Sequence, residues 1–288
     1  MLSRNTGVKK ISSALMEKKP ILLKKTYNAE SSRLQMKQPV VSSKTIVLQS
    51  HRKPLPYPWL KQCLQSVESW SKKNHYDYFF MGDELFDPIE ESILIKTRQQ
   101  TVIATDLARL LAQQKYLQQG YQTVIWCDAD FLIFDPDRFI IPQTSYALGR
   151  EVWVQRDKHN KLKAYSKVHN AFLMFRQGNS FLDFYTDTAR RLVAMNTGSM
   201  PPQFIGPKLL TALHNIVQCP VLETAGMLCP LVIQDLMNGG GAAVDLFNQT
   251  SSESIRAANL CSSLVSEQQN RKMNTLIEKL TSQDPALF

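Results

Sequence analysis

A short apolar run that leads directly into two carboxylates constrains this chain more than any other feature. Residues 123–127 read TVIWC, and Asp128-Ala129-Asp130 follows without a break. A short run that is apolar throughout is typical of a central parallel strand, because such a strand is covered on both faces. The sequence therefore predicts an acidic pair at the carboxyl end of a buried strand, where open α/β sheets bind their ligands.

Strands and helices are expected to alternate around this run. Apolar runs rich in β-branched or aromatic residues predict further strands at 45–48, 76–80 and 171–175. Helical apolar periodicity or helix-start signals predict helices from Pro58, over 97–119, over 181–195, from Gly206-Pro207 through His214, and over 264–280. Long loops are expected at 81–96 and 238–254. We expect an α/β fold, in which a mostly parallel, Rossmann-like sheet is flanked by helices.

The positive charge of the chain is concentrated at its N-terminus. Of the net charge of +9, residues 1–44 contribute ten Lys or Arg against Glu17 and Glu30. The rest is nearly neutral, so we expect no nucleic-acid partner for the folded part. The composition predicts a disordered basic tail over 1–44 and a single domain over 45–288. Three interpretations of the tail stay open: a solvated extension, a contact with anionic membrane, or an organelle transit peptide.

The cysteines and the hydropathy indicate a compartment. Five cysteines occur at scattered positions with no CxxC pair, which disfavours both zinc and a disulfide framework. No run of about 18 apolar residues is present, so no membrane-spanning helix is expected. We therefore expect a reduced, cytoplasmic protein, peripheral to a membrane if the tail binds lipid.

The acidic pair has the chemistry of a hard-cation site. Asp128 and Asp130 are one residue apart, so their side chains project to the same side of an extended chain. Carboxylate oxygens are preferred ligands of Mg²⁺ and Mn²⁺. A cation there would bridge a diphosphate and neutralise the charge that develops when a diphosphate leaves. The alternative is that the motif is a plain turn at the end of a strand.

A second charged pair precedes the acidic strand. Asp106 and Arg109 are at i and i+3 of the helix expected over 97–119, so they share a face. They form either part of a ligand site or a surface ion pair, which contributes little to stability.

These segments together resemble a known family. The resemblance is carried by Thr105-Asp106-Leu107-Ala108-Arg109, Tyr116-Leu117, Gly120-Tyr121 and 124–130. They are similar to the core of the DXD-motif glycosyltransferases of the GT-A fold, the group with yeast outer-chain mannosyltransferases, capsular sugar transferases and glucosylating clostridial toxins. Asn170-Ala171-Phe172 and Gly206-Pro207 resemble later family motifs. The sequence departs from the family at Gln119, where the family has a glycine, and no His follows His214.

The resemblance implies a function and a set of site residues. It implies a metal-dependent hexosyltransferase of polysaccharide biosynthesis that moves a sugar from a UDP- or GDP-sugar to a glycan, lipid-linked or other hydroxyl acceptor. Asp106 and Arg109 would hold the donor sugar, and Asn170 is a further candidate donor-binding residue. Asp128 would contact ribose or Mn²⁺ or Mg²⁺, and Asp130 would bind the metal. Asn259, followed by Ser262, is the candidate C-terminal ligand of metal or phosphate.

Two further groups of residues are weaker candidates. The loop after the first strand is expected to receive the nucleotide, which makes Gln49, Ser50 and Arg52 candidate donor-binding residues. His169, beside Asn170, is either a general base or a structural histidine. Trp126 is expected to be a core residue.

Three other functions fit the sequence less well. A phosphohydrolase of the Asp-x-Asp-x-Thr type needs Thr at position 132, where Leu132 stands. A nucleotidyltransferase that makes nucleotide-sugars would need a glycine-rich loop after the first strand, and residues 49–58 contain no glycine. A catalytically degenerate nucleotide-sugar-binding scaffold would be indicated by loss of Arg109 or Asp130, and both are present.

Overall fold

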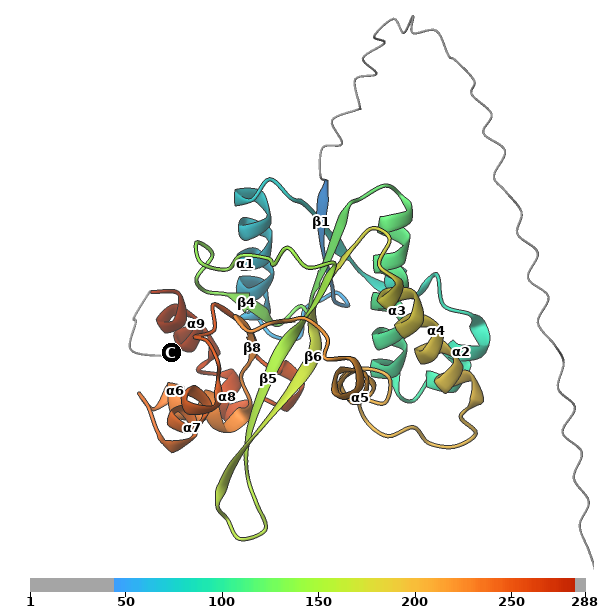
Figure 1. The fold of residues 1–288 in the computed structure, drawn as a ribbon. Coiled ribbons are helices and arrows are strands. Elements are labelled where there is room, and N and C mark those ends of the chain that lie inside the picture. The colour runs from blue at the N-terminus through green and yellow to red at the C-terminus, as the bar shows by residue number, and fades with distance from the viewer. Residues whose placement is uncertain (1–43, 283–288) are drawn as a thin grey trace, which may run out of the picture. The chain divides into compact units, whose positions relative to one another are not determined.

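The computed structural model describes residues 44–282. Its main sheet has six strands in the order β2-β1-β3-β6-β5-β7 (Figure 1). All strands run in one direction except β6, which is antiparallel to both of its neighbours. The strands are β1 (Thr45–Ser50), β2 (Asp77–Met81), β3 (Thr123–Cys127), β5 (Tyr146–Arg156), β6 (Leu162–Arg176) and β7 (Val221–Leu222). The expected mostly parallel sheet flanked by helices is confirmed.

Helices cover both faces of this sheet, and the alternation along β1 shows why. Ile46 and Leu48 pack in one apolar cluster with helices α3 (Thr101–Gln118) and α4 (Ser180–Met195). Val47 points to the other face and packs with Trp70 of α1 (Leu60–Lys73). Because successive side chains of a strand alternate between faces, a strand that is covered on both sides is apolar at consecutive positions, as Ile46, Val47 and Leu48 are.

A second, smaller sheet lies beside the end of β3. It has the order β4-β9-β8, formed by Phe131–Ile133, Ala257–Asn259 and Ala225–Met227. Its neighbours in the chain are the short helices α6 (Pro230–Met237), α7 (Ala242–Thr250), α8 (Glu267–Asn270) and α9 (Met273–Thr281). Of these helices, α6, α7 and α9 share an apolar cluster with residues of α1, β4 and β5. The chain crosses from the main sheet to the second sheet at Asp128-Ala129-Asp130.

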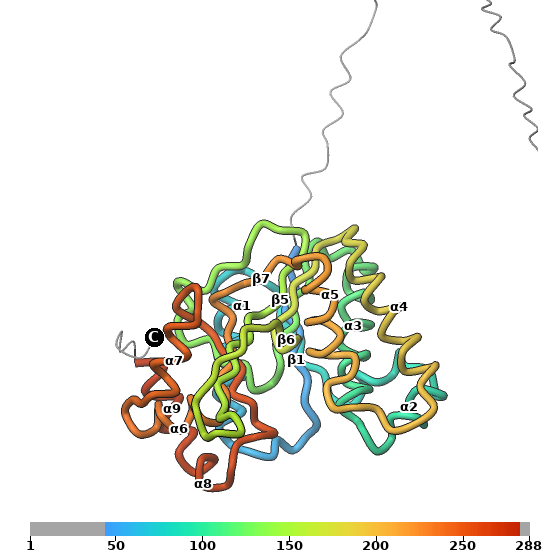
Figure 2. The backbone as a smooth tube through the Cα atoms, turned by 60° about the horizontal axis from the view of Figure 1, so that its bottom comes forward, coloured from blue at the N-terminus to red at the C-terminus, as the bar shows by residue number. Residues whose placement is uncertain are grey.

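Strands β5 and β6 continue beyond the sheet as a long hairpin (Figures 1 and 2). Their register shifts at a bulge between Leu148 and Gly149. In both views α5 (Pro207–Val217) lies beside the hairpin. Only the inner end of β6, over 171–175, was expected as a strand, and β5 was not expected.

Four expected elements differ in detail from the structure. The helix expected over 97–119 is observed as α3, which begins at Thr101 because the backbone is not helical at Gln100, and Thr97 belongs to the separate helix α2 (Glu91–Thr97). The expected loops at 81–96 and 238–254 contain the 3₁₀ helix η1 (Asp83–Phe86), α2 and α7. The helix expected over 264–280 is broken into η2 (Ser262–Leu264), α8 and α9, because Ser266 and Gln269 form a capping box that starts a new helix.

The basic N-terminal segment lies almost entirely outside the described part of the chain. The prediction of a disordered tail over 1–44 falls on residues 1–43, which are not described. Within residues 44–282, no helix combines the length and the hydropathy needed to cross a bilayer.

Candidate functional site

The acidic pair stands where β3 ends and the second sheet begins. The amide of Asp128 donates to the carbonyl of Ala171 on β6 over 2.8 Å, and the carbonyl of Asp128 accepts from the amide of Phe131 over 3.0 Å. The first bond holds Asp128 at the end of the main sheet, and the second closes a turn into β4. The Asp128 side chain is 26% exposed, whereas Asp130 is buried. The predicted position of the pair is therefore confirmed.

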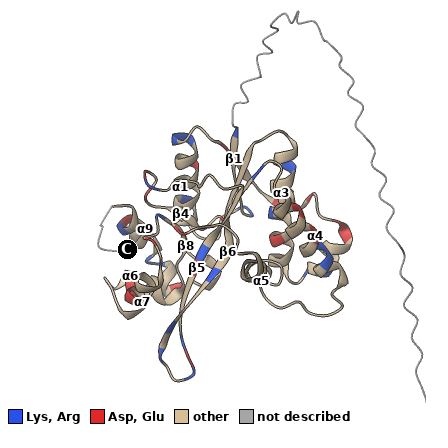
Figure 3. Cartoon of the chain, in the orientation of Figure 1, with Lys and Arg blue, Asp and Glu red and all other residues tan. Residues whose placement is uncertain are grey.

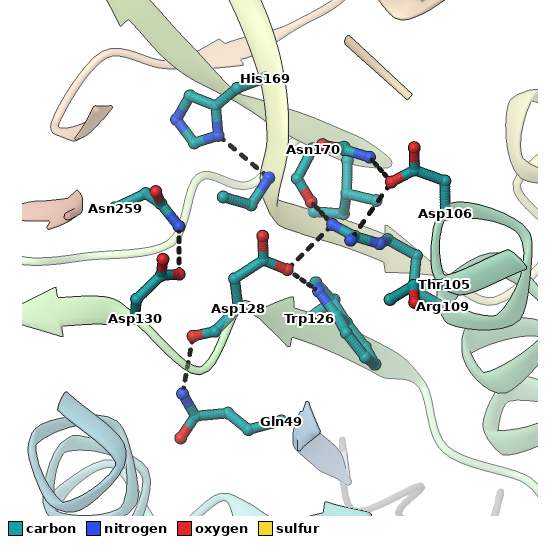
Figure 4. Close-up of polar contacts among 12 residues, drawn as sticks. Gln49, Thr105, Asp106, Arg109, Trp126, Asp128, Asp130, His169, Asn170 and Asn259 are labelled. Atoms are coloured by element: carbon teal, nitrogen blue, oxygen red, sulfur yellow. Dashed lines mark hydrogen bonds and ion pairs between the residues drawn. The ribbon is translucent and has the colours of Figure 1, made fainter. Parts of the chain in front are cut away.

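Arg109 joins the helix carboxylate to the acidic pair (Figure 4). Its Nη1 donates to Asp128 Oδ1 over 2.9 Å and to the carbonyl of Asn170 over 2.8 Å. Its Nη2 lies 3.2 Å from Asp106 Oδ1, which also accepts from Asn170 Nδ2 over 2.8 Å. Both members of the Asp106–Arg109 pair are nearly inaccessible to solvent, so this is not a surface ion pair. We call Asp106, Arg109, Asp128 and Asn170 the arginine network.

The arginine network leaves two buried polar atoms without a partner. Asp106 Oδ2 and Arg109 Nε form no hydrogen bond within residues 44–282. Gly206 lies against the same carboxylate: a Cβ built on it would stand 2.5 Å from Asp106 Oδ2 and 2.9 Å from Asn170 Nδ2. Buried polar atoms are nearly always satisfied, so two orphans in one network call for an explanation.

Burial dominates the electrostatics of these carboxylates. It raises the pKa of Asp106 to about 6, against the opposing effects of Arg109 and of the Asn170 hydrogen bond. Burial also raises the pKa of Asp130, and the negative charge of Asp128 adds to that rise. Burial lowers the pKa of Arg109, but the charges of Asp128 and Asp106 outweigh it and the net shift is upward. The guanidinium is therefore the fixed positive charge of the site.

Asp130 is held from the second sheet. Phe131 pairs with Asn259 in the β4–β9 ladder, which brings the Asn259 side chain beside Asp130. Asn259 Nδ2 donates to Asp130 Oδ1 over 2.6 Å, and the amide of Ser262 donates to Asp130 Oδ2 over 2.7 Å. The structure thus brings Asp130 to two residues that lie 129 and 132 positions further along the chain. No group of three or more His, Cys, Asp or Glu suited to a metal is found within the described residues.

Gln49, predicted as a loop residue that binds the donor, instead lies near the end of β1 and holds the turn at Asp128. Gln49 is fully buried, and its Nε2 donates to the carbonyl of Asp128 over 3.0 Å. Its Oε1 accepts from the hydroxyl of Tyr78 over 3.0 Å, so its side chain is already used in holding the turn. The Ser50 and Arg52 side chains form no hydrogen bond or ion pair with any described residue, and their predicted role stays a prediction.

His169 is a structural residue and not a general base. It is fully buried, its Nε2 is 3.1 Å from the carbonyl of Ala225, and its Nδ1 accepts from the amide of Ala171 over 3.1 Å. Burial lowers its pKa to about 4. Gly149 is required beside it, because a Cβ there would overlap the ring.

Trp126 is the site residue that the sequence interpretation missed. It is buried as expected, but its Nε1 also donates to Asp128 Oδ1 over 2.7 Å, and Arg109 lies 5.3 Å from its ring centre. The signal was available in the spacing: Trp126 and Asp128 are two apart at the end of a strand and so lie on one side. A buried indole N–H also usually finds an acceptor.

Comparisons with known proteins give distant structural matches only. No family model and no curated protein matches this chain. A glycosyltransferase involved in glycosylation of the major capsid of PBCV-1 matches with 10% identity and a TM-score of 0.45, over 81% of this chain and 99% of that one. The galactosyltransferase LgtC, in complex with donor and acceptor sugar analogs, matches with 10% identity and a TM-score of 0.42, over 82% and 96%. A 4-diphosphocytidyl-2C-methyl-D-erythritol synthase from Anaerococcus prevotii DSM 20548 matches with 8% identity and a TM-score of 0.38, over 82% and 99%. This level of similarity does not distinguish between the functions of these proteins.

Proposed function

We propose that this chain is a metal-dependent glycosyltransferase of the GT-A fold that transfers a sugar from a UDP- or GDP-sugar to a hydroxyl acceptor. The observation that carries the proposal is the arginine network at the carboxyl end of β3, where Arg109 links Asp106 of α3 to Asp128 of the acidic pair. The resemblance in sequence supports it, because the residues that carry the resemblance are the ones that meet in space.

The arginine network has the chemistry of a sugar-binding site. A sugar presents hydroxyl groups that both donate and accept hydrogen bonds. Asp106 Oδ2 and Arg109 Nε supply one unfilled acceptor and one unfilled donor, and Asn170 adds an amide beside them. We propose that Asp106, Arg109 and Asn170 hold the donor sugar, and that Ser50 at the end of β1 and Arg52 after it lie toward the nucleotide, whereas the buried Gln49 holds the turn at Asp128 and does not contact the donor.

The acidic pair suits a divalent cation that takes only two or three of its ligands from the protein. Asp128 Oδ2 forms no hydrogen bond with the described residues, and Asp130 is a buried carboxylate close to a second negative charge. Mg²⁺ in nucleotide sites is commonly bound by one or two carboxylates, with the remaining ligands supplied by phosphates and water. We propose Asp128 and Asp130 as ligands of Mn²⁺ or Mg²⁺, and Asn259 as a third ligand or a contact of phosphate. When bound, the cation would neutralise charge on the departing diphosphate.

A thermal-shift experiment tests this proposal directly. The melting temperature is measured with Mn²⁺ plus UDP, GDP, ADP or CMP, and with UTP and GTP as the nucleotides that a nucleotidyltransferase would bind. A ligand at one hundred times its Kd adds about 2.7 kcal/mol to the free energy of unfolding. We expect a rise of several degrees with one nucleoside diphosphate, only when Mn²⁺ is present.

Matched variants connect the shift to the acidic pair. Asp130→Asn should abolish the nucleotide-dependent shift, whereas Asp137→Asn should keep it, since Asp137 is exposed and paired with Lys73 outside the site. A shift that persists in Asp130→Asn, or the absence of a shift with every nucleoside diphosphate in the unmodified protein, would overturn the proposal.

A further inference from the structure

A small cavity lies between the β5–β6 hairpin and the start of α5. Its volume is about 190 Å³, below the roughly 300–1,000 Å³ of pockets for drug-sized ligands. Figures 1 and 2 both place α5 beside the hairpin. The lining residues are Glu151, Lys167, Gln203, Pro207, Lys208 and Thr211. We call this space the hairpin cavity, and its size suits a single small ligand.

Glu151 is the feature of the hairpin cavity that calls for a ligand. Glu151 as a whole is only 7% exposed. Its carboxylate forms no hydrogen bond or ion pair with any residue in 44–282. Burial raises its pKa, and the charge of Lys167, its cross-strand neighbour, opposes that rise. The carboxylate oxygens of Glu151 are not among the fully buried unpaired atoms of residues 44–282. They therefore face the cavity that the residue lines, where hydrogen-bond donors of a ligand can reach them.

The other lining groups restrict the charge of that ligand. The lining carries charges of both signs, the Glu151 carboxylate and the ammonium groups of Lys167 and Lys208, so it is not matched to a ligand of one charge alone. Gln203 and Thr211 can each both donate and accept hydrogen bonds. A neutral ligand with several hydroxyl groups satisfies all of these groups at once, and a sugar ring is such a ligand.

The hairpin cavity adjoins the arginine network through one residue. Pro207 lines the cavity and follows Gly206, which lies against Asp106 Oδ2 and Asn170 Nδ2. Lys167 is likewise three residues before Asn170 on β6. A sugar in the cavity would therefore stand next to the residues proposed to hold the donor.

We propose that the hairpin cavity is the acceptor subsite, in which Glu151 accepts hydrogen bonds from the hydroxyl groups of an acceptor sugar. The role of that sugar as an acceptor rests on the proposed function, but the binding of a neutral sugar through Glu151 is measurable without any transfer reaction. Glu151 is thus a specificity-determining residue that contacts the acceptor and lies apart from the acidic pair.

Saturation-transfer NMR on the full chain tests the proposal. The probes are the methyl glycosides of mannose, glucose, galactose and N-acetylglucosamine, each added without nucleotide. We expect at least one glycoside to bind the unmodified protein, and Glu151→Gln to weaken its affinity about tenfold or more, as for loss of a hydrogen bond to a charged group. Glu68→Gln is the matched control, because Glu68 lies on α1 and pairs only with Lys72 among the described residues.

The outcomes separate this inference from the proposed function. Equal binding by Glu151→Gln and the unmodified protein, or no binding of any glycoside to the unmodified protein, would overturn the acceptor subsite even where nucleotides raise the melting temperature. Glycoside binding that depends on Glu151 supports the acceptor subsite even where no nucleotide raises the melting temperature. The missing nucleotide shift would then overturn only the proposed donor site. Glu151→Gln must keep the nucleotide-dependent shift, since a loss of that shift would mean that Glu151 acts through the arginine network and would contradict its assignment.

Discussion

At the scale of single residues, one guanidinium holds the site together. Arg109 contacts Asp106, Asp128 and the carbonyl of Asn170, each from a different part of the chain. A planar fork of donors can serve several acceptors at once, which the point charge of Lys cannot do in the same way. Because both carboxylates are close to this one cation, removing it would leave buried negative charge uncompensated.

Asp106 should make the stability of the protein depend on pH in an unusual direction. Its pKa is raised from 3.8 to about 6 in the folded state, so the folded protein binds the proton more tightly than the unfolded chain does. The stabilising effect of that proton is present below pH 4 and is lost as the pH rises through 6. A shift of about two units corresponds to about 3 kcal/mol of the free energy of unfolding.

The comparison with Asp106→Asn isolates this effect. Urea unfolding of both proteins is measured between pH 4 and pH 7. The free energy of unfolding of the unmodified protein should fall relative to that of Asp106→Asn by up to about 3 kcal/mol over this range. The groups that face Asp106 are Arg109, Asn170, Asp128 and Tyr185, and they remain in both proteins. Parallel curves would show that burial does not raise this pKa.

The sequence predicted the members of the site better than their environment. Spacing places Asp106 and Arg109 on one helix face, and a buried strand places Asp128 at a sheet edge, so these positions follow from local geometry. The burial of Asp106 and Arg109 could not be predicted in this way, because it depends on how α4 and the segment before α5 pack over α3. The partnership of Asp130 with Asn259 depends on the register of two strands that are distant in the sequence.

At the scale of elements, the start of α5 is positioned by a missing side chain. Gly206→Ala should bring its new Cβ into contact with Asp106 and Asn170. Overpacking of this kind costs about 1–3 kcal/mol, and we expect the same change to abolish the nucleotide-dependent thermal shift by displacing Asp106. Gly198→Ala is the control, because Gly198 precedes the same helix and a Cβ placed on it would meet no neighbouring atom within 4 Å. Equal melting temperatures for the two variants would contradict the close approach.

The sequence predicted the elements whose buried residues form a regular apolar pattern within one continuous segment. β1 and β3 each contain a continuous apolar run, at 46–48 and 124–127, and α1 and α4 carry a regular apolar stripe, so each is recognisable by itself. β5 was missed because Arg150 and Glu151 interrupt its apolar run. Arg150 donates hydrogen bonds to Glu223, and Glu151 lines the hairpin cavity. The short strands β7, β8 and β9 have two or three residues each, too few for any pattern.

At the scale of the whole chain, the site depends on two sheets meeting. The main sheet supplies Asn170 and the second sheet supplies Asn259, while the turn between the two sheets carries Asp128 and Asp130. Acidic and basic residues both occur among the elements on either side of the main sheet (Figure 3), so the described part has no single dominant charge. The strong positive charge of the chain therefore belongs to its N-terminal segment.

Deleting residues 1–40 should separate membrane attraction from nucleotide binding. The deletion removes nine of the 34 Lys and Arg of the chain and two of its 25 acidic residues. Each basic residue near an anionic bilayer contributes about 1 kcal/mol of attraction. The full chain should therefore sediment with phosphatidylserine vesicles at low salt, less so at high salt, and not with neutral phosphatidylcholine vesicles. The shortened chain should not sediment with either, but it should keep its melting temperature and its nucleotide-dependent shift. Unchanged sedimentation of the shortened chain would place the lipid contact on residues 41–288, and no sedimentation of the full chain would leave the basic segment as a solvated extension.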